Sequence, residues 1–211
     1  MLEWGRGGAQ ERLLIDAGLM DLHSRFAAGT YYGFLLTHFH VDHVQGLFHL
    51  RWGNTSPIPV WCPDDPQGCA DLLKHPGCLS FKPTLDHGES FNINRLKITP
   101  LAMKHSRPTM GFLFEYGIMS VAYLTDTDGL SAQTLDFLLE RQPIDAIVLD
   151  CSFPPNSEAG NHGNLDIARL IQEKLKPKEL IITHIGHDLD RWLMENGVPN
   201  WVEIGRDGME I

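Results

Sequence analysis

A short stretch of the chain, Thr37 to His43, is unusually rich in side chains that bind metal ions. It reads THFHVDH and supplies His38, His40, Asp42 and His43. Neutral imidazole and carboxylate groups suit borderline divalent ions such as zinc, manganese or iron. His38 and His40, two positions apart, can reach one ion from the same side. Asp42 and His43 come one turn later and are expected to face a second ion. A histidine-rich loop without metal is the alternative, and this density of ligand types argues against it.

The residues on either side of this stretch predict a strand followed by a helix. Residues 31–37 are apolar and aromatic, which is typical of a buried strand, and residues 44–52 have the apolar spacing of a helix. The cluster therefore falls in a strand-to-helix turn. Ligand sites of α/β folds are commonly found at such turns.

Further ligand-type residues recur where later strands are predicted to end. His105 follows a strand predicted over 96–101, Asp126 follows one over 119–124, and His184 follows one over 180–183. A continuous apolar run, 146–150, predicts another buried strand. It leads through a long polar loop to His162, and Asn164 then caps a predicted amphipathic helix over 165–175. This alternation of strands and helices indicates an α/β fold.

The remaining segments are expected to support the site. Residues 1–10 predict a turn or a poorly ordered start. Residues 12–18 predict a strand that runs into a turn. Asp16 ends this strand and is expected to lie in the turn or to support a metal ligand. A strand over 58–61, a helix over 68–75 and a hairpin of 109–116 with 119–124 around Gly117 complete the pattern. His49 and His75 stand alone and are interpreted as histidines that are either on the surface or satisfied by hydrogen bonds, outside the site.

Length and composition fit one globular domain over residues 1–211, with 43% hydrophobic residues to form a core. There is no leader-like segment and no apolar run near the roughly 18 residues of a membrane span, so a cytoplasmic location without membrane contact is expected. The four cysteines lack a CxxC spacing and are expected to be free thiols. The net charge of −10 disfavours binding to nucleic acid.

The HxHxDH motif, followed by a solitary histidine, a solitary aspartate and a last histidine, resembles the metallo-β-lactamase superfamily from Leu13 onward. The resemblance implies an αββα sandwich with two metal ions along one edge. It assigns one ion to His38, His40 and His105, the other to Asp42, His43 and His184, and Asp126 as the bridge between them. Phosphodiester hydrolases of the superfamily carry aspartate at the bridging position, whereas classical β-lactamases carry cysteine. Asp126 thus disfavours a lactamase.

A closer likeness is seen in residues 37–52, 65–76, 180–187 and 192–196, which resemble the PhnP family of phosphoribosyl cyclic phosphate phosphodiesterases of the carbon-phosphorus lyase pathway. This resemblance implies hydrolysis of 5-phosphoribosyl 1,2-cyclic phosphate to ribose 1,5-bisphosphate in phosphonate catabolism. The chain departs from the family near its start, because Gly7-Gly8-Ala9-Gln10 runs almost directly into residues 13–18 without the family's cysteine-rich insert. His187 matches the histidine of the family's structural zinc but lacks the cysteines, so a structural zinc has little support, and the sandwich is expected to be shortened at its N-terminus.

The expected chemistry follows from these assignments. Two divalent ions, manganese or zinc, would activate a shared water and attract an anionic, small-molecule cyclic phosphodiester. His162 on the covering loop is the candidate catalytic acid for the leaving oxygen, and Asp42 could also accept a proton. For the quaternary structure, we consider a homodimer. One alternative is another hydrolase of the superfamily, such as a thioesterase or an RNA-processing nuclease. The other is a non-catalytic remnant that lacks the family's N-terminal cysteine-rich segment.

Overall fold

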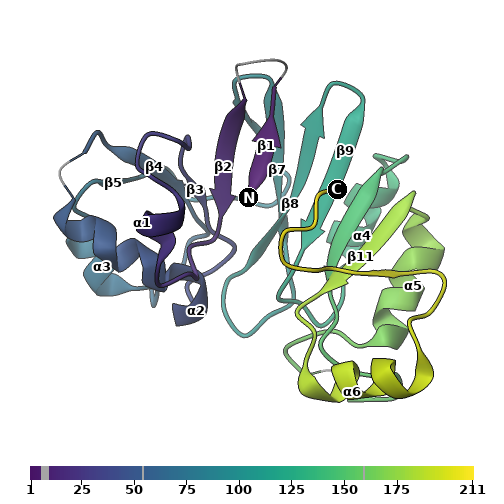
Figure 1. Ribbon diagram of the computed structural model, residues 1–211. Coiled ribbons are helices and arrows are strands. Elements are labelled where there is room, and N and C mark those ends of the chain that lie inside the picture. Colours follow the sequence, from purple (N-terminus) through teal and green to yellow (C-terminus); the bar gives the residue numbers. More distant parts are fainter. Residues whose placement is uncertain (6–9, 54, 159) are drawn as a thin grey trace. The chain divides into compact units, whose positions relative to one another are not determined.

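The computed structural model describes residues 1–5, 10–53, 55–158 and 160–211 (Figure 1). Two compact units make up the chain, residues 1–86 and residues 87–211, and each contains one sheet. Most of the GGAQ turn, residues 7–9, lies outside the described residues. Among the described residues, no helix combines the length and the apolarity that crossing a bilayer requires.

The first unit is a five-stranded mixed sheet with short helices. Its strands, in the order in which they pair, are β1 (Leu2–Trp4), β2 (Glu11–Ile15), β3 (Phe34–Leu35), β4 (Ile58–Trp61) and β5 (Leu79–Phe81). Its helices are α1 (Leu22–Arg25), α2 (Val41–Val44), the 3-10 helix η1 (Gln45–Trp52) and α3 (Ala70–Lys74). β1 is antiparallel to β2, and the other pairs are parallel. Because β2 and β3 are parallel, Asp16 and Thr37, which follow them, lie at the same edge of the sheet.

Burial of apolar side chains explains the packing of this unit. Leu22, Val44, Leu47 and Leu72 from the helices join strand residues such as Phe34 in one buried cluster. Each fully buried side chain of this kind stabilises the fold by about 1.5–3 kcal/mol relative to an exposed one.

The structure corrects two predictions in the first unit and shortens a third element. Residues 2–4, predicted as a turn or a poorly ordered start, form β1, because Leu2 pairs with Leu13 across an antiparallel ladder. Residues 45–52 are helical but of the 3-10 type, and the close approach of Gly46 to the carbonyl oxygens of Ala17 and Leu19 accompanies this tight winding. The strand predicted over 31–37 is reduced to β3, which pairs with its neighbours over two residues only.

The second unit is a seven-stranded mixed sheet. Its strands are β6 (Phe91–Ile93), β7 (Leu96–Ala102), β8 (Met110–Tyr116), β9 (Met119–Leu124), β10 (Ala146–Asp150), β11 (Glu179–Thr183) and β12 (Glu203–Ile204), paired in the order β12-β11-β10-β9-β8-β7-β6. Strands β9 to β12 pair in parallel, and β6 to β9 pair antiparallel. Two reversals separate β7 from β9, so these two strands run in the same direction. The carboxyl ends of β7, β9, β10 and β11 therefore meet at one edge.

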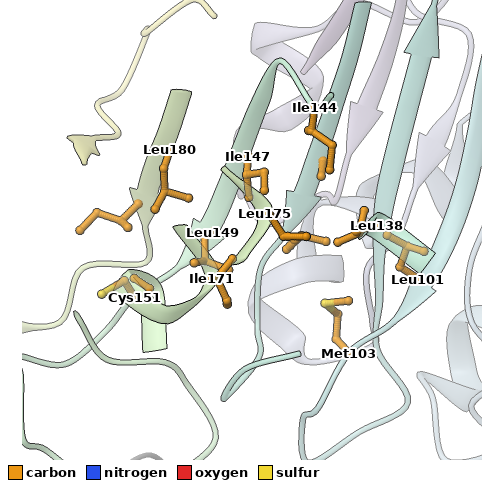
Figure 2. Packing of buried hydrophobic residues seen from close by; sticks show 14 of the residues in the cluster. Leu101, Met103, Leu138, Ile144, Ile147, Leu149, Cys151, Ile171, Leu175 and Leu180 are labelled. Atoms are coloured by element: carbon orange, nitrogen blue, oxygen red, sulfur yellow. The ribbon is translucent and has the colours of Figure 1, made fainter. Parts of the chain in front are cut away.

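Helices α4 (Ala132–Leu139), α5 (Leu165–Leu175) and α6 (His187–Asn196) contribute to the core of this unit. Figure 2 shows Leu138 of α4 and Leu175 of α5 packed with Ile147 and Leu149 of β10. The prediction for α5 is confirmed at both ends, and the side chain of Asn164 accepts a hydrogen bond from the backbone of the first turn, as expected of a cap.

The fold class predicted from the sequence is confirmed, because each unit is a mixed sheet flanked by helices. The hairpin of β8 and β9 and the strands β2, β4, β7, β10 and β11 are confirmed as well. All four cysteines are free thiols. The single domain over 1–211 stays a prediction.

Candidate metal centre

In the first unit, the carboxylate of Asp16 organises the histidine cluster. Asp16 ends β2 in a left-handed conformation, with φ 57°. Its Oδ1 accepts a hydrogen bond from the backbone N–H of Thr37 at 2.7 Å, and its Oδ2 accepts one from the Thr37 hydroxyl at 2.8 Å. Oδ2 also lies 2.8 Å from Nδ1 of His43. Burial raises the pKa of Asp16, and the hydrogen bond with His43 acts in the opposite direction.

Thr37 connects Asp16 to a second histidine, His38. Its hydroxyl donates to Asp16 and lies 3.0 Å from Nδ1 of His38, which can donate to the hydroxyl oxygen. His38 is fully buried, and its Nε2 lies 2.7 Å from Nδ1 of His40. A partner at Nδ1 sets the ring orientation and the tautomer, and it directs Nε2 toward an ion. His38 and His43 are both held in this way.

Asp42 is the more accessible of the predicted ligands in this unit. Its side chain is 65% exposed, and Oδ2 lies 3.6 Å from Nε2 of His43. The backbone around it is braced by the turn after β2. Ala17 donates its N–H to the carbonyl of His43 at 2.7 Å, and a Cβ at Gly18 would clash with the carbonyl oxygen of Asp42. A cavity of about 410 Å³ has both Asp16 and Asp42 in its wall.

In the second unit, a carboxylate at the end of β10 plays the corresponding part. Asp150 is buried, and its Oδ2 accepts hydrogen bonds from the backbone N–H of Thr127 at 2.9 Å and from Nδ1 of His162 at 2.7 Å. Its Oδ1 lies 3.2 Å from the hydroxyl of Ser152, which in turn lies 2.8 Å from Nδ1 of His184. Burial raises the pKa of Asp150, and the hydrogen bond with His162 opposes that rise.

These contacts converge on three residues that could hold an ion together. Ligand atoms of Asp126, His162 and His184 all lie within 4.8 Å of one another. The rings of His162 and His184 stack with centroids 4.4 Å apart. Asp126 and His184, which follow β9 and β11, both have left-handed backbones, with φ 55° and 62°. Because both imidazoles are held at Nδ1, their Nε2 atoms are the ones available to a divalent ion, and the donor set fits zinc or manganese.

His105 lies beside this cluster in the second unit. It follows β7, its Nδ1 lies 3.0 Å from the backbone carbonyl of Asn161, and its ring lies 5.2 Å from that of His162. The structure thus gathers His38, His40, Asp42 and His43 in the first unit and His105, Asp126, His162 and His184 in the second. That the two sets share ions stays a prediction.

Sequence reasoning did not assign the residues that hold these histidines. Asp150, Ser152 and Asn161 were visible as polar residues after a buried strand or in the loop before His162, but their partners are distant in the chain. His187, which begins α6, is exposed.

Comparison with known proteins agrees with this architecture. A model of the beta-lactamase superfamily domain matches residues 11–185. No curated protein sequence gave a significant match. Among solved structures, a diphosphatase from the PhnP family is 23% identical with a TM-score of 0.73, over 97% of this chain and 80% of that chain.

Two further structures show the same fold. The metallo-β-lactamase fold protein YhfI from Bacillus subtilis is 18% identical with a TM-score of 0.76, over 98% of this chain and 89% of that chain. Zn²⁺-bound PqqB from Methylobacterium extorquens is 17% identical with a TM-score of 0.69, over 93% of this chain and 80% of that chain. With its histidine and aspartate clusters at the ends of parallel strands, the chain belongs to the beta-lactamase superfamily and has the metallo-β-lactamase fold.

Proposed function

We propose that this hydrolase is a dinuclear metal-dependent phosphodiesterase. Its proposed substrate is 5-phosphoribosyl 1,2-cyclic phosphate, which it converts to ribose 1,5-bisphosphate in phosphonate catabolism. The observation that carries the proposal is the cluster of Asp126, His162 and His184, in which the residue expected to bridge two ions is an aspartate. The similarity to a PhnP-family structure supports the finer assignment.

The proposed ligands come from both units. His38, His40 and His105 would hold one ion, Asp42, His43 and His184 the other, and Asp126 both, as the superfamily resemblance implies. Zinc and manganese suit these donors, and PqqB, which has the same fold, is a Zn²⁺-bound protein. When bound, two such ions lower the pKa of a shared water and stabilise negative charge on the phosphoryl oxygens.

His162 is proposed to supply the proton that the leaving oxygen requires. In the hydrolysis, the water oxygen forms a bond to phosphorus, the bond from phosphorus to ribose O2 breaks, and O2 takes the proton. Nδ1–H of His162 donates to Asp150, so in the doubly protonated ring Nε2–H is the group that gives its proton to O2, which leaves a neutral imidazole. Asp42, whose carboxylate is exposed, is proposed to accept the proton that the water releases.

Charge favours a small anionic substrate over a polyanion. The chain carries a net charge of −10, which opposes the approach of RNA, whereas two bound divalent ions would make the site locally positive. We therefore propose a small-molecule phosphodiester as the substrate and no nucleic-acid partner.

Cleavage of a diphosphate bond is a second candidate. The PhnP-family structure is described as a diphosphatase, and the same proton donor would serve a phosphate leaving group. Such a leaving group is less basic than a ribose alkoxide and therefore depends less on an acid.

The test is hydrolysis by the purified chain before and after removal of metal. We expect no turnover of ribosyl 1,2-cyclic phosphate or of bis(p-nitrophenyl) phosphate in excess chelator, and recovery when Mn²⁺ or Zn²⁺ is added back. Faster turnover of a nucleoside diphosphate ester than of the cyclic phosphate would favour the second candidate. Full activity in chelator, or no cleavage of any of these substrates with metal present, would refute the proposal.

A further inference from the structure

Asn161 links two loops that the mechanism needs in one place. It precedes His162 on the loop after β10, and it contacts two consecutive residues after β7, His105 and Ser106. The backbone carbonyl of Asn161 lies 3.0 Å from Nδ1 of His105. Its side-chain Oδ1 accepts a hydrogen bond from the backbone N–H of Ser106 at 2.7 Å, and its Nδ2 donates to the Ser106 hydroxyl at 3.0 Å.

The two side-chain bonds fix how the loops align. Neither His105 and Ser106 nor residues 160–163 belong to a helix or strand, so no ladder of backbone hydrogen bonds sets their register. The Asn161 side chain uses both its acceptor and its donor on Ser106, as a backbone pair would in a sheet. This alignment is what brings the Asn161 carbonyl to the His105 ring, because Ser106 follows His105 directly.

The alignment of the two loops affects the positions of both His105 and His162. His105 and His162 lie with ring centroids 5.2 Å apart, and His162 stacks on His184. On its other side His162 is held by Asp150. Side chains therefore hold the loop through the His162 ring at Asp150 and through Asn161 at Ser106, and the backbone holds it where the carbonyl of Gly163 accepts from the N–H of Ser152 at 2.8 Å.

We infer that Asn161 is a positioning residue: through Ser106 it holds His105 in the tautomer and orientation that a metal ligand needs and keeps His162 beside it. This inference rests on the proposed function for the roles of the two histidines. It assigns to Asn161 no contact with the substrate or the ions. A carbonyl that accepts from Nδ1 keeps the proton on that atom and leaves Nε2 for the ion.

The experiment compares Asn161→Ala, Asn161→Asp and Ser106→Ala with the wild-type chain. Asn161→Asp keeps an acceptor for the Ser106 N–H, and its second oxygen can accept from the Ser106 hydroxyl, so it is the conservative variant. The matched control is Asn196→Ala, which loses a side-chain bond to the carbonyl of Trp192 in α6. Three quantities are measured: the His105 tautomer from ring ¹⁵N shifts of metal-free protein, the Kd for Zn²⁺, and kcat and KM for bis(p-nitrophenyl) phosphate.

Loss of a group that supports a metal ligand typically weakens metal binding or activity about 10- to 100-fold. For Asn161→Ala we expect the lower end of that range, about tenfold in Kd for Zn²⁺ and in kcat, with KM changed less than about twofold. The His105 ring should change from one Nδ1–H tautomer to a mixture. Asn161→Asp should recover most of the loss, Ser106→Ala should show part of it, and Asn196→Ala should show none.

Wild-type values in Asn161→Ala for tautomer, Kd and kcat would overturn the inference, as would equal losses in Asn196→Ala. Failure of the wild-type chain to bind Zn²⁺ and to hydrolyse the ester would instead refute the proposed function. Even then the His105 tautomer tests whether Asn161 couples the loops: a mixture of tautomers in Asn161→Ala but not in Asn196→Ala supports the coupling, and an unchanged ring in Asn161→Ala refutes it.

Discussion

Oδ2 of Asp150 lies 2.7 Å from Nδ1 of His162, and the same oxygen accepts the backbone N–H of Thr127, which directly follows Asp126. One buried carboxylate at the end of β10 therefore fixes both the ring of the proposed acid and the backbone beside the proposed bridging ligand. Contacts of this kind make the geometry of a site depend on residues that never touch the substrate.

Asp150→Asn should lower kcat about 10- to 100-fold on a substrate with an alkyl leaving group. The amide that replaces the carboxylate can turn an N–H toward Nδ1 and so favour the wrong tautomer of His162. Steady-state kinetics and metal content measure the effect. Asp145→Asn, at the residue just before β10, is the control and should keep kcat. Equal activities of the two variants would show that Asp150 does not position the acid.

His162→Ala distinguishes a proton donor from a metal ligand. Help from a general acid is typically worth about 10²–10⁴-fold, so kcat on an alkyl leaving group should fall by that order, while an ester with an acidic aryl leaving group should lose much less. Both ions should remain in elemental analysis. Loss of an ion would instead make His162 the third ligand of the cluster with Asp126 and His184, and equal losses on both esters would indicate phosphate binding.

Asp126→Ala should lose metal as well as rate, because a carboxylate that bridges two ions holds both. Elemental analysis after dialysis and turnover with added Zn²⁺ measure the two effects. Asp128→Ala, two residues along the same loop, is the matched control and should retain metal, since Asp128 pairs with Lys104 at 2.9 Å. A variant at Asp126 that kept two ions and near-native turnover would show that the bridge is assigned wrongly.

Gly18→Ala should disturb the first unit through the backbone alone. The added methyl group would clash with the carbonyl oxygen of Asp42, and overpacking of this kind typically costs about 1–3 kcal/mol. We expect a lower free energy of unfolding and weaker Zn²⁺ binding, measured by urea titration and calorimetry. Gly160→Ala is the control, because a methyl group there would meet no atom within 4 Å. Unchanged stability and Kd in Gly18→Ala would contradict the close packing of this turn.

Asp145 should make the stability of the metal-free chain sensitive to acid. Its hydrogen bond with Lys178, with a smaller effect from the backbone of Ser120, holds the pKa of Asp145 below the ordinary value of 3.8. A carboxylate with a lowered folded pKa contributes its full stability above the unfolded pKa and loses it as the pH falls through the folded value. In urea titrations, the difference between wild type and Asp145→Asn should thus be constant above pH 3.8 and shrink below it. A difference that grows in acid would contradict this assignment.

Local signals in the sequence predicted the elements that local forces decide. The cap at Asn164 and the apolar spacing that follows define α5 at both ends, and the continuous apolar run 146–150 defines β10. By contrast, β1 depends on pairing with β2, and the 3-10 winding of η1 accompanies the tight contact of Gly46 with the preceding turn. Such tertiary effects leave little trace in a short sequence window.

In the candidate site, too, local sequence patterns could be interpreted, whereas contacts between distant segments could not be predicted. The candidate ligands could be picked out because HxHxDH and the strand-end residues are patterns in one chain segment at a time. The roles of Asp150 and Asn161 could not, because they arise only when β10 lies beside β9 and β11 and when the loop before His162 meets the end of β7. Asp16 was expected in a turn or supporting a ligand, and it lies 2.8 Å from Nδ1 of His43; that His43 binds an ion stays a prediction.

The left-handed backbones at Asp16, Asp126 and His184 carry a further consequence. Residues other than glycine pay about 1–3 kcal/mol for this conformation, and aspartate and histidine tolerate it better than most. Glycine at any of these positions would relieve that strain and delete a group the chemistry needs. Selection for thermal stability alone would therefore favour glycine at these three positions, as at Asn94, Asn156 and Lys176, and here the more stable descendants would lose candidate metal ligands or the carboxylate that holds one.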